Sequence, residues 1–359
     1  MNDNLQALRD RIDVLDEKIQ ALISERAACA QQVAEVKRAS GDHNECYRAE
    51  REAEVLRKAL ARNRGPLSDA EMAQLFREIM SACRALEQPL SVAYLGPQGT
   101  YSEAAVLKHF GHAVTALPLT GIESIFHDVE SGAANYGVVP VENSTEGVIS
   151  HTLDMFMISP LKICGEVELP IHHHLLSKAD ALGAVTRVYA HQQAFAQCRA
   201  WLDAHLPGVE RAAVSSNAEG ARRAAQEPGT AAIAGDSAAA IYQLHSLASN
   251  IEDDPRNTTR FLVIGKQGAA PSGQDKTSLL VSTRNQPGAL HSLLAPLAHH
   301  KISMTRIESR PSRQTAWEYV FFIDIEGHAQ DQPVASALLE IQPEAALLKV
   351  LGSYPKAVP

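Results

Sequence analysis

Along the first 40 residues, apolar side chains recur at spacings of three and four, which is the period of one face of an α-helix. We call this row the apolar seam, and it consists of Leu5, Leu8, Ile12, Leu15, Ile19, Leu22, Cys29, Val33 and Val36, with position 26 in the same series. The pattern predicts one long helix. With about 35 residues at ~1.5 Å each, this helix would span roughly 50 Å, longer than a small domain is wide. We therefore expect a second copy of the chain to cover much of the seam, in a dimer or a higher oligomer.

Two shorter helical patterns follow the long one. Turn residues at 41–44 are expected to end the first helix, and a second helix is expected over about 48–62. A third helix is expected to begin at Ser68, which can form a capping box with Glu71. Residues 1–88 are thus predicted to be entirely helical.

Beyond these helices the pattern changes to short apolar runs, each followed by a loop and a helical pattern. The runs at 92–95 and 136–141 are examples, and the alternation is typical of an α/β fold. Residues 266–274 have the composition of a flexible linker. After them, the order of strand and helix patterns fits a small βαββαβ module at residues 277–352.

Composition narrows the class of protein. A chain of 359 residues with 45% hydrophobic content is large enough for two to four domains. It has no run of 18 apolar residues and no signal sequence, so we expect a cytoplasmic protein that does not bind the membrane. The five cysteines form no CxxC pair, which favours reduced thiols and argues against structural zinc. Because 33 basic and 42 acidic residues give a net charge of −9, nucleic acid is an improbable partner.

Three cations lie on or beside the apolar seam. Arg26 occupies a seam position, and Arg9 and Lys37 directly follow seam residues. Each could pair with an acid across the seam, because an unpaired buried charge is costly. Alternatively, together they bind one small molecule that carries several negative charges. Arg51 and Glu52 on the next helix favour this second interpretation.

The segments ALRDRIDVLDEKI, SERAACAQQVAEVK and YRAEREAEVLR, which contain these residues, resemble the all-helical chorismate mutase domain. The resemblance implies a pericyclic rearrangement of the chorismate dianion, which needs neither a nucleophile nor a metal. Cations hold the two carboxylates of the substrate, and donors near its ether oxygen stabilise the charge that develops there. By position, the site residues would be Arg9, Arg26, Lys37, Arg51 and Glu52, with Arg9 reaching the site of a partner chain.

Three positions depart from the mutase pattern. Arg48 stands where the family has a binding Asp, and Cys83 stands where it has a Ser. Glu87 takes the place of a Gln that faces the ether oxygen in some members. Because a carboxyl group donates a hydrogen bond only when it is protonated, we expect mutase activity to fall as the pH rises.

Three loop motifs in the α/β segment lie near predicted strand ends. GPQGTYSE at 96–103 joins a strand to a helix and offers backbone N–H groups to an anion, but it matches neither G-x-G-x-x-G nor a Walker loop. GVVPVENSTEG at 137–147 ends a second strand, where ligands of open α/β sheets tend to bind. NTTRFLVIG at 257–265 begins a third strand. Each motif alone would more often be a helix cap or a turn.

In this order and spacing, the three motifs resemble the signatures of prephenate dehydratases over residues 91–267. The resemblance implies two α/β lobes around a cleft, similar to periplasmic solute-binding proteins, with the second lobe near 168–245. Thr259 would be the acid that helps the ring hydroxyl of prephenate leave, while Arg260 would bind a carboxylate or hold the loop. The remaining substrate contacts would be Asn143, Ser144, Thr145, Gln197 and Ser215.

No cofactor or metal is expected for this reaction. Loss of water and carbon dioxide from prephenate creates an aromatic ring, so the protein need only orient the dianion and stabilise the departing oxygen. His172, His173 and His174 suggest a metal site, but successive residues of a strand point to opposite faces and do not easily converge.

Two motifs of the C-terminal module resemble those of ACT domains, which have a ferredoxin-like α+β fold. One opens a helix at 288 after a strand, and the other, at 307–311, is expected between two strands. Alone they would be ordinary cap and loop sequences. The resemblance implies a phenylalanine site across a subunit interface, formed by Gly288, Ala289, Leu290, Glu308, Ser309, Arg310 and Pro311.

Together, the three segments resemble bifunctional enzymes of phenylalanine biosynthesis that phenylalanine inhibits. Two other interpretations stay open. One is a dehydratase whose mutase domain has degenerated, which Arg48 and Cys83 would explain. The other is a non-catalytic amino acid sensor made of two lobes and an ACT domain, although the cations of the helical segment and Thr259 argue against it. Separate assays with chorismate and with prephenate would discriminate among the three.

Overall fold

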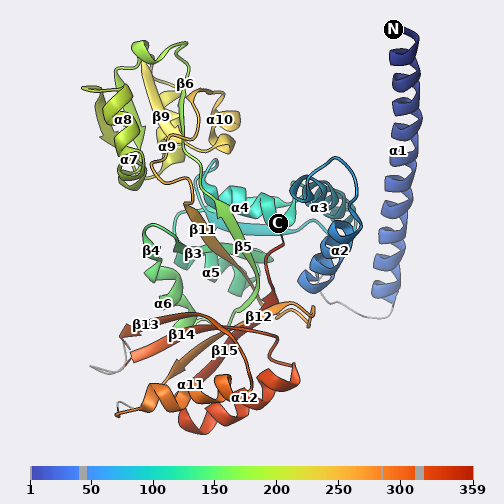
Figure 1. Cartoon of the computed structure of the whole chain (residues 1–359), viewed down its shortest axis with the longest axis vertical. Coiled ribbons are helices and arrows are strands. Elements are labelled where there is room, and N and C mark those ends of the chain that lie inside the picture. Colours follow the sequence, from blue (N-terminus) through green and yellow to red (C-terminus); the bar gives the residue numbers. More distant parts are fainter. Residues whose placement is uncertain (1, 40–46, 284–285, 312–318, 359) are drawn as a thin grey trace.

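The computed structural model describes residues 2–39, 47–283, 286–311 and 319–358. A helical segment, two α/β lobes and a C-terminal α+β module follow one another along the chain (Figure 1). The predicted fold class is therefore confirmed. The turn expected at 41–44 and Cys46 lie outside the described residues.

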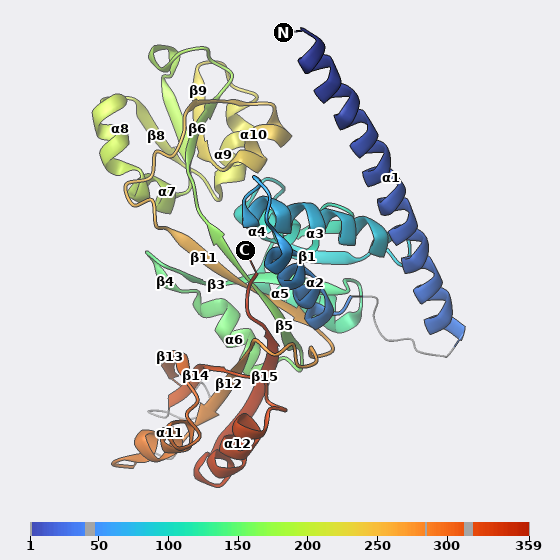
Figure 2. The ribbon, with the colours of Figure 1, turned by 45° about the vertical axis from the view of Figure 1, so that its right-hand side comes forward.

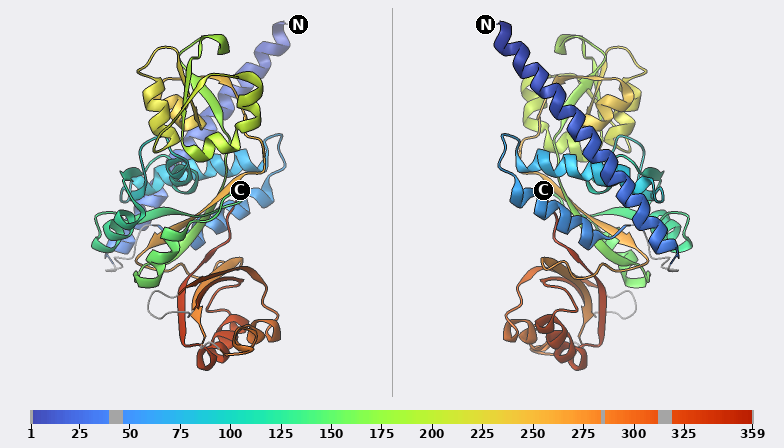
Figure 3. Two further views of the ribbon diagram at one scale, coloured as in Figure 1. Left: turned by 90° about the vertical axis from the view of Figure 1, so that its left-hand side faces the viewer. Right: turned by 90° about the vertical axis from the view of Figure 1, so that its right-hand side faces the viewer.

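Helix α1 (Asn2–Ala39) is the long helix that the apolar seam predicts. It runs beside the lobes and stands apart from them in Figure 2, passes behind or in front of them in the two views of Figure 3, and contacts helix α3 (Asp69–Ala85). Along the part of α1 whose side chains are described, only Ala34 is buried, whereas Ile12 and Leu22 expose 54% and 64% of their surface. The seam is thus left uncovered by a single chain. None of the described helices, α1 included, is both long enough and apolar enough to cross a bilayer.

Helices α2 (Ala49–Arg62) and α3 pack against the first lobe. The capping box predicted for α3 is confirmed, since Ser68 Oγ accepts from the backbone N–H of Glu71 and the Glu71 side chain accepts from the backbone N–H of Ser68. Just before α2, Tyr47 enters the same apolar core as Phe110 and Tyr136 of the first lobe. The helical segment is therefore joined to this lobe by side-chain packing.

The first lobe is a mixed sheet covered by helices α4 (Tyr101–Phe110), α5 (Ile122–Ser131) and α6 (Ser150–Ile158). Its strand order is β2-β1-β3-β11-β5, with β4 beside β3. The strands are β1 (Ser91–Leu95), β2 (Thr115–Leu119), β3 (Tyr136–Asn143), β4 (Gly147–Val148), β5 (Lys162–Pro170) and β11 (Thr258–Gly265). Strand β11 enters this sheet only after the chain has built the second lobe, and it runs antiparallel to β3 and β5. This return places the NTTRF motif beside the VENST motif.

The second lobe has the strand order β10-β6-β9-β7-β8. Its strands are β6 (His174–Ser177), β7 (Arg187–Ala190), β8 (Glu210–Ala213), β9 (Thr230–Ala234) and β10 (His245–Ala248). Its helices are the 3-10 helix η1 (Leu182–Ala184), α7 (Gln192–Gln197), α8 (Arg199–His205), α9 (Asn217–Ala224) and α10 (Asp236–Tyr242). The chain crosses between the lobes twice, after β5 and before β11, so a cleft between them has walls from both.

The C-terminal module has the predicted βαββαβ order. It consists of β12 (Asp275–Ser282), α11 (Ala289–His299), β13 (Met304–Pro311), β14 (Tyr319–Glu326), α12 (Gln332–Glu344) and β15 (Leu347–Pro355), with the strand order β13-β14-β12-β15. One prediction was wrong, because residues 307–311 form strand β13 and do not lie between strands. Their polar composition resembles a loop, but β13 is an edge strand, where polar residues and a terminal proline are tolerated.

One face of this C-terminal sheet packs on α11 and α12, and the other packs on the first lobe. Leu280, Phe322 and Leu351 belong to the same apolar core as the residues of the first lobe. A Cβ added to Gly352 would lie 2.1 Å from the carbonyl oxygen of Ile163, so β15 passes directly against β5. The module and the first lobe therefore share one core.

Candidate active sites

A cavity of about 860 Å³ lies between the two lobes, a size that suits a small molecule. Its first-lobe wall includes the loop that begins α4 and the ends of β3 and β11. Its second-lobe wall includes α7 and the start of α9. Four side chains predicted to contact substrate line it, namely Asn143, Gln197, Ser215 and Thr259.

Asn143 and Thr259 are cross-strand partners on β3 and β11, and they are hydrogen-bonded. Nδ2 of Asn143 donates to Oγ1 of Thr259 over 2.8 Å. Oδ1 of Asn143 accepts from the backbone N–H groups of Thr145 and Glu146, which fixes the orientation of the amide. Because the Thr259 oxygen accepts from an amide, its own proton is free to be donated into the cleft.

His173 connects the cleft walls, although the sequence did not single it out as a cleft residue. Its Nε2 lies 2.8 Å from Oε1 of Gln197, whose Nε2 donates to the Thr145 hydroxyl over 3.0 Å. On the other side, its Nδ1 lies 2.9 Å from the Tyr101 hydroxyl. Burial lowers the pKa of His173 below its usual value, so the ring is neutral at pH 7. The sequence did not single out Tyr101 as a cleft residue either, although its place in the GPQGTYSE motif could have indicated it.

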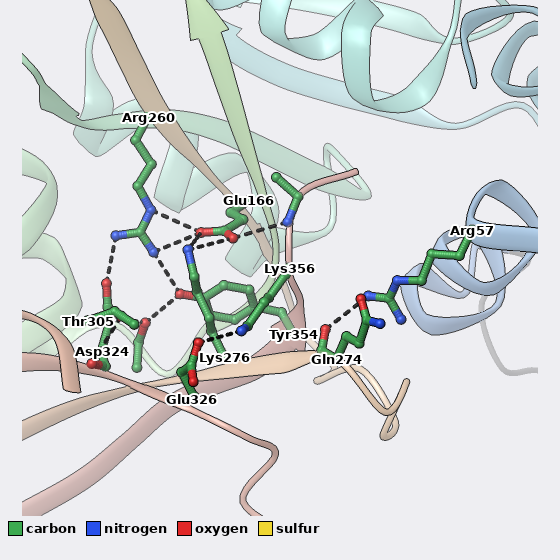
Figure 4. A network of polar contacts seen from close by, with 12 residues as sticks. Arg57, Glu166, Arg260, Gln274, Lys276, Thr305, Asp324, Glu326, Tyr354 and Lys356 are labelled. Atoms are coloured by element: carbon green, nitrogen blue, oxygen red, sulfur yellow. Dashed lines mark hydrogen bonds and ion pairs between the residues drawn. The ribbon is translucent and has the colours of Figure 1, made fainter. Parts of the chain in front are cut away.

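Two predicted substrate contacts have other roles in this structure. Ser144 joins β3 to β11, since its hydroxyl accepts from the backbone N–H of Thr258 over 3.0 Å. Arg260 follows Thr259 on the strand, so it points to the opposite face and pairs with Glu166 and Asp324 (Figure 4). Neither side chain lines the cleft between the lobes.

The three consecutive histidines have separate partners. Nδ1 of His172 contacts Glu252 at 2.8 Å, and Nε2 of His174 lies 3.3 Å from Asp236, while His173 faces the cleft. Within the described part of the chain, the side chains whose potential metal-ligating atoms lie close together are in another place, on and beside helices α11 and α12. It consists of His299, His300 and Glu340.

Only some of the cations predicted to bind chorismate lie close to one another in the helical segment. Nζ of Lys37 lies 4.0 Å from Oε2 of Glu87, so an acid of the same chain stands beside this lysine. A carboxylate oxygen of Glu52 accepts a hydrogen bond from Arg84. Burial raises the pKa of Glu52, although Arg84 and Arg26 act to lower it. Internal pairing, one of the two alternatives open from the sequence, thus occurs at Lys37.

A cavity of about 470 Å³ lies beside these residues. It is lined by Val33, Lys37, Arg48, Glu50, Arg51, Glu54, Pro271 and Ser272. Glu52 lines a different cavity of about 330 Å³ against the first lobe. Cys83 is buried on α3. Arg9 precedes Lys37 by 28 positions, or about 42 Å along α1, so the two cannot meet in one chain.

The two predicted effector motifs lie on different elements of the C-terminal module. Gly288 caps α11 with φ +82°, a left-handed conformation that favours glycine, and Ala289 and Leu290 follow it. The other motif ends β13, where Nη2 of Arg310 lies 3.1 Å from Oδ1 of Asp154 in the first lobe. An effector site between subunits stays a prediction.

Comparison with known families identifies three domains in one order. The chain matches the models for chorismate mutase type II over residues 8–88, prephenate dehydratase over 92–269 and the ACT domain over 277–342. It is 60% identical to the bifunctional chorismate mutase/prephenate dehydratase of Stutzerimonas stutzeri and 58% identical to that of Pseudomonas aeruginosa, each over 99% of both chains.

A solved structure matches the last two domains. It is the prephenate dehydratase from Arthrobacter aurescens in complex with L-Phe, with a TM-score of 0.69 and 36% identity over 74% of this chain and 90% of that chain. The curated relatives and the three domain matches extend the likeness to the helical segment. The chain is therefore a member of the bifunctional chorismate mutase/prephenate dehydratase family, with both enzymatic domains followed by an ACT domain.

Proposed function

We propose that the cleft between the lobes is where prephenate loses water and carbon dioxide to give phenylpyruvate, with Thr259 as the donor to the departing ring hydroxyl. The hydrogen bond from Asn143 carries this proposal, because the oxygen of Thr259 accepts from the amide at the wall of the cavity and its own proton can be donated to the substrate. A threonine hydroxyl is a weak acid but an adequate donor to a leaving oxygen whose departure creates an aromatic ring.

The carboxylates of prephenate need partners in a cleft whose His173 is neutral. Two helices begin at its walls, α4 after Thr100 and α9 after Ser216. The free N–H groups and the positive dipole ends of helix N-termini bind anions. We assign the two carboxylates to these helix starts, with Gln197 and Ser215 as further polar contacts.

For the mutase reaction, we propose that chorismate binds where α1, α2 and α3 meet, in an assembly of at least two copies. The uncovered apolar seam supports the assembly, as does Arg9, which can complete a site only on another copy. The cavity beside Lys37 is also lined by Arg48 and Arg51, so it gathers three cations of the chain, although Glu87 stands near Lys37 and Glu54 pairs with Arg51. The remaining residues assigned to this site are Arg26, Glu52, Cys83 and Glu87.

We further propose that phenylalanine binds the C-terminal module at Gly288–Leu290 and Glu308–Pro311 and inhibits the dehydratase. The relative that is complexed with L-Phe supports this ligand. An effector inhibits only if it prefers the less active arrangement. The cysteine pattern favours a reducing compartment, so we assign the protein to the cytoplasm.

Separate steady-state assays with chorismate and prephenate test these assignments. Thr259→Ala should lower phenylpyruvate formation by about 10²- to 10³-fold, as for removal of one transition-state donor, and leave the mutase rate unchanged. Thr259→Ser keeps the hydroxyl and should retain most of the activity. Loss of both activities would indicate global damage, and a fully active Thr259→Ala would refute the role of the hydroxyl.

A further inference from the structure

The face of β3 and β11 that points away from the cleft carries two opposite charges. Directly beside the Asn143–Thr259 pair, Glu142 and Arg260 are also cross-strand partners. Successive residues of a strand point to opposite faces. This second pair therefore faces the C-terminal sheet, on the reverse side of the residues proposed to act on prephenate.

The C-terminal sheet presents a matching pair. Arg306 on β13 and Asp324 on β14 are cross-strand partners. Nε of Arg306 lies 2.8 Å from Oε2 of Glu142, and Nη1 of Arg260 lies 2.6 Å from Oδ2 of Asp324. We call Glu142, Arg260, Arg306 and Asp324 the charge clamp, because two ion pairs of opposite sense join two strands of each sheet.

The Arg260 half of the clamp is buried and has many partners (Figure 4). Nη2 of Arg260 donates to the Tyr354 hydroxyl over 3.0 Å, and Glu166 accepts from Nε at the same distance. The Arg260 side chain exposes 13% of its surface. Burial alone would lower the pKa of Arg260, but Tyr354, Asp324 and Glu166 raise it above the usual value. This half therefore stays charged and holds β11 firmly on the C-terminal sheet.

The Arg306 half is less completely bonded. The Glu142 side chain is 37% exposed, and Nη2 of Arg306 is buried without a hydrogen-bond partner among the described residues. A buried donor without a partner is unfavourable. Strand β13 is also the edge of its sheet, and its pairing with β14 is irregular between Met304 and Arg306. This half should therefore shift more easily than the Arg260 half.

We propose that the charge clamp positions Thr259 against Asn143, and that the C-terminal module acts on the dehydratase reaction through the Arg306 half. The inference rests on the proposed role of Thr259 and adds four positioning residues that do not touch the substrate. Because Glu308–Pro311 follow Arg306 on the same strand, a ligand at that segment moves the guanidinium that holds Glu142. A displacement of about 1 Å at reacting groups can lower a rate by about 10²-fold.

The test compares full-length variants in the prephenate assay with and without phenylalanine. Arg306→Met and Glu142→Gln should each lower the dehydratase kcat by about tenfold or more, with KM changed less than about twofold, because geometry and not binding is altered. The mutase rate should be unchanged in both. Arg306→Lys keeps a positive charge beside Glu142 and should retain most of the kcat.

Lys349→Met is a matched control at the same interface. Nζ of Lys349 donates to the carbonyl oxygens of Phe156 (2.9 Å) and Ser159 (2.7 Å), which belong to α6 and its end and not to β3 or β11. This variant should keep its kcat and its response to phenylalanine. In Arg306→Met, by contrast, calorimetry should still detect phenylalanine binding, while inhibition of the dehydratase is weakened.

Three outcomes would overturn the inference. They are an equal loss of kcat in Lys349→Met, a loss in Arg306→Lys as large as that in Arg306→Met, and full kcat with normal inhibition in Arg306→Met. A wild-type chain without prephenate turnover would instead refute the proposed function, and the inference would fall with it. An active wild type with fully active clamp variants would refute the inference alone.

Discussion

The dehydratase cleft and the mutase segment differ in how much of each site one chain assembles. Asn143 and Thr259 are each 8% exposed and are held by the ladder of two buried strands. The mutase cations are spread along α1, whose 38 residues extend about 57 Å. Strands bring distant segments together within one chain. We expect a long helix that buries little of its apolar face to pack on another copy, and we therefore expect only the dehydratase site to be complete in one chain.

The largest expected effect on this difference between the two sites comes from a substitution in the apolar seam. Ile12→Asp places a charge on the face that we expect a second copy to cover, so it should abolish assembly through α1 and lower mutase activity by at least about 10²-fold. Dehydratase activity should be retained. Sedimentation velocity and both assays check this, with Arg11→Ala on the exposed polar side as the control. A monomeric Ile12→Asp with full mutase activity would contradict the expectation.

Asn143 tests how strongly the dehydratase site depends on its internal hydrogen bonds. Asn143→Ala removes the donor that orients Thr259 and leaves buried polar groups unpaired, which should lower kcat/KM for prephenate by about 10- to 100-fold. The mutase assay on the same preparation is the internal control. Asn143→Asp keeps the size but replaces the donor with an acceptor, so recovery of activity in that variant would argue against the proposed orientation.

His109 lies on α4 where the helical segment meets the first lobe, and its Nε2 is 2.6 Å from the Tyr47 hydroxyl. Burial, assisted by Arg77 and Arg84, lowers the pKa of His109 to about 3, below an unfolded value of about 6.5. Its contribution to stability is thus complete above pH 6.5 and is lost as the pH falls toward 3. The free energy of unfolding should fall by about 2 kcal/mol between pH 6.5 and pH 5.

Denaturant titrations at several pH values check this slope. His109→Gln cannot titrate, so its stability should depend less on pH in that window than the stability of the wild type. Parallel curves for the two proteins would show that folding does not lower the pKa of His109.

The smallest expected effect is on the mutase rate and comes from a substitution of Glu87. A carboxylate cannot donate a hydrogen bond to the ether oxygen of chorismate, whereas an amide can. Glu87→Gln restores a donor at every pH and should raise the rate several-fold at high pH, by roughly the worth of one hydrogen bond. Mutase pH profiles of the two proteins check this. A Glu87→Gln protein with the wild-type mutase rate at high pH would refute the role of Glu87.

The sequence predicted helices and their ends well where a single local pattern determines the secondary structure. The apolar seam predicted α1, and Ser68 with Glu71 predicted the start of α3. Glu308–Pro311 were misplaced, because a polar run suits both a loop and an edge strand, and only the neighbouring strand distinguishes them.

Site residues could be predicted only as far as a local motif reaches. The motif predicted Thr259 as a site residue, and the structure places it in the cavity between the lobes. Arg260 was predicted to bind a carboxylate or hold the loop, and nothing local reveals that Asp324 stands opposite it. In the same way, alternation shows that the three histidines diverge without showing that His173 is the one in the cleft. Contacts between modules depend on packing that no single segment encodes.

Mixing two inactive variants tests most directly whether the mutase site needs two chains. Arg9→Ala and Lys37→Ala should each lack mutase activity and retain dehydratase activity. After denaturation and joint refolding, half of the dimers are mixed, and one of their two sites contains both wild-type residues, so about a quarter of the mutase activity should return. A mixture that stays inactive in the mutase assay, with dehydratase activity intact, would contradict the account.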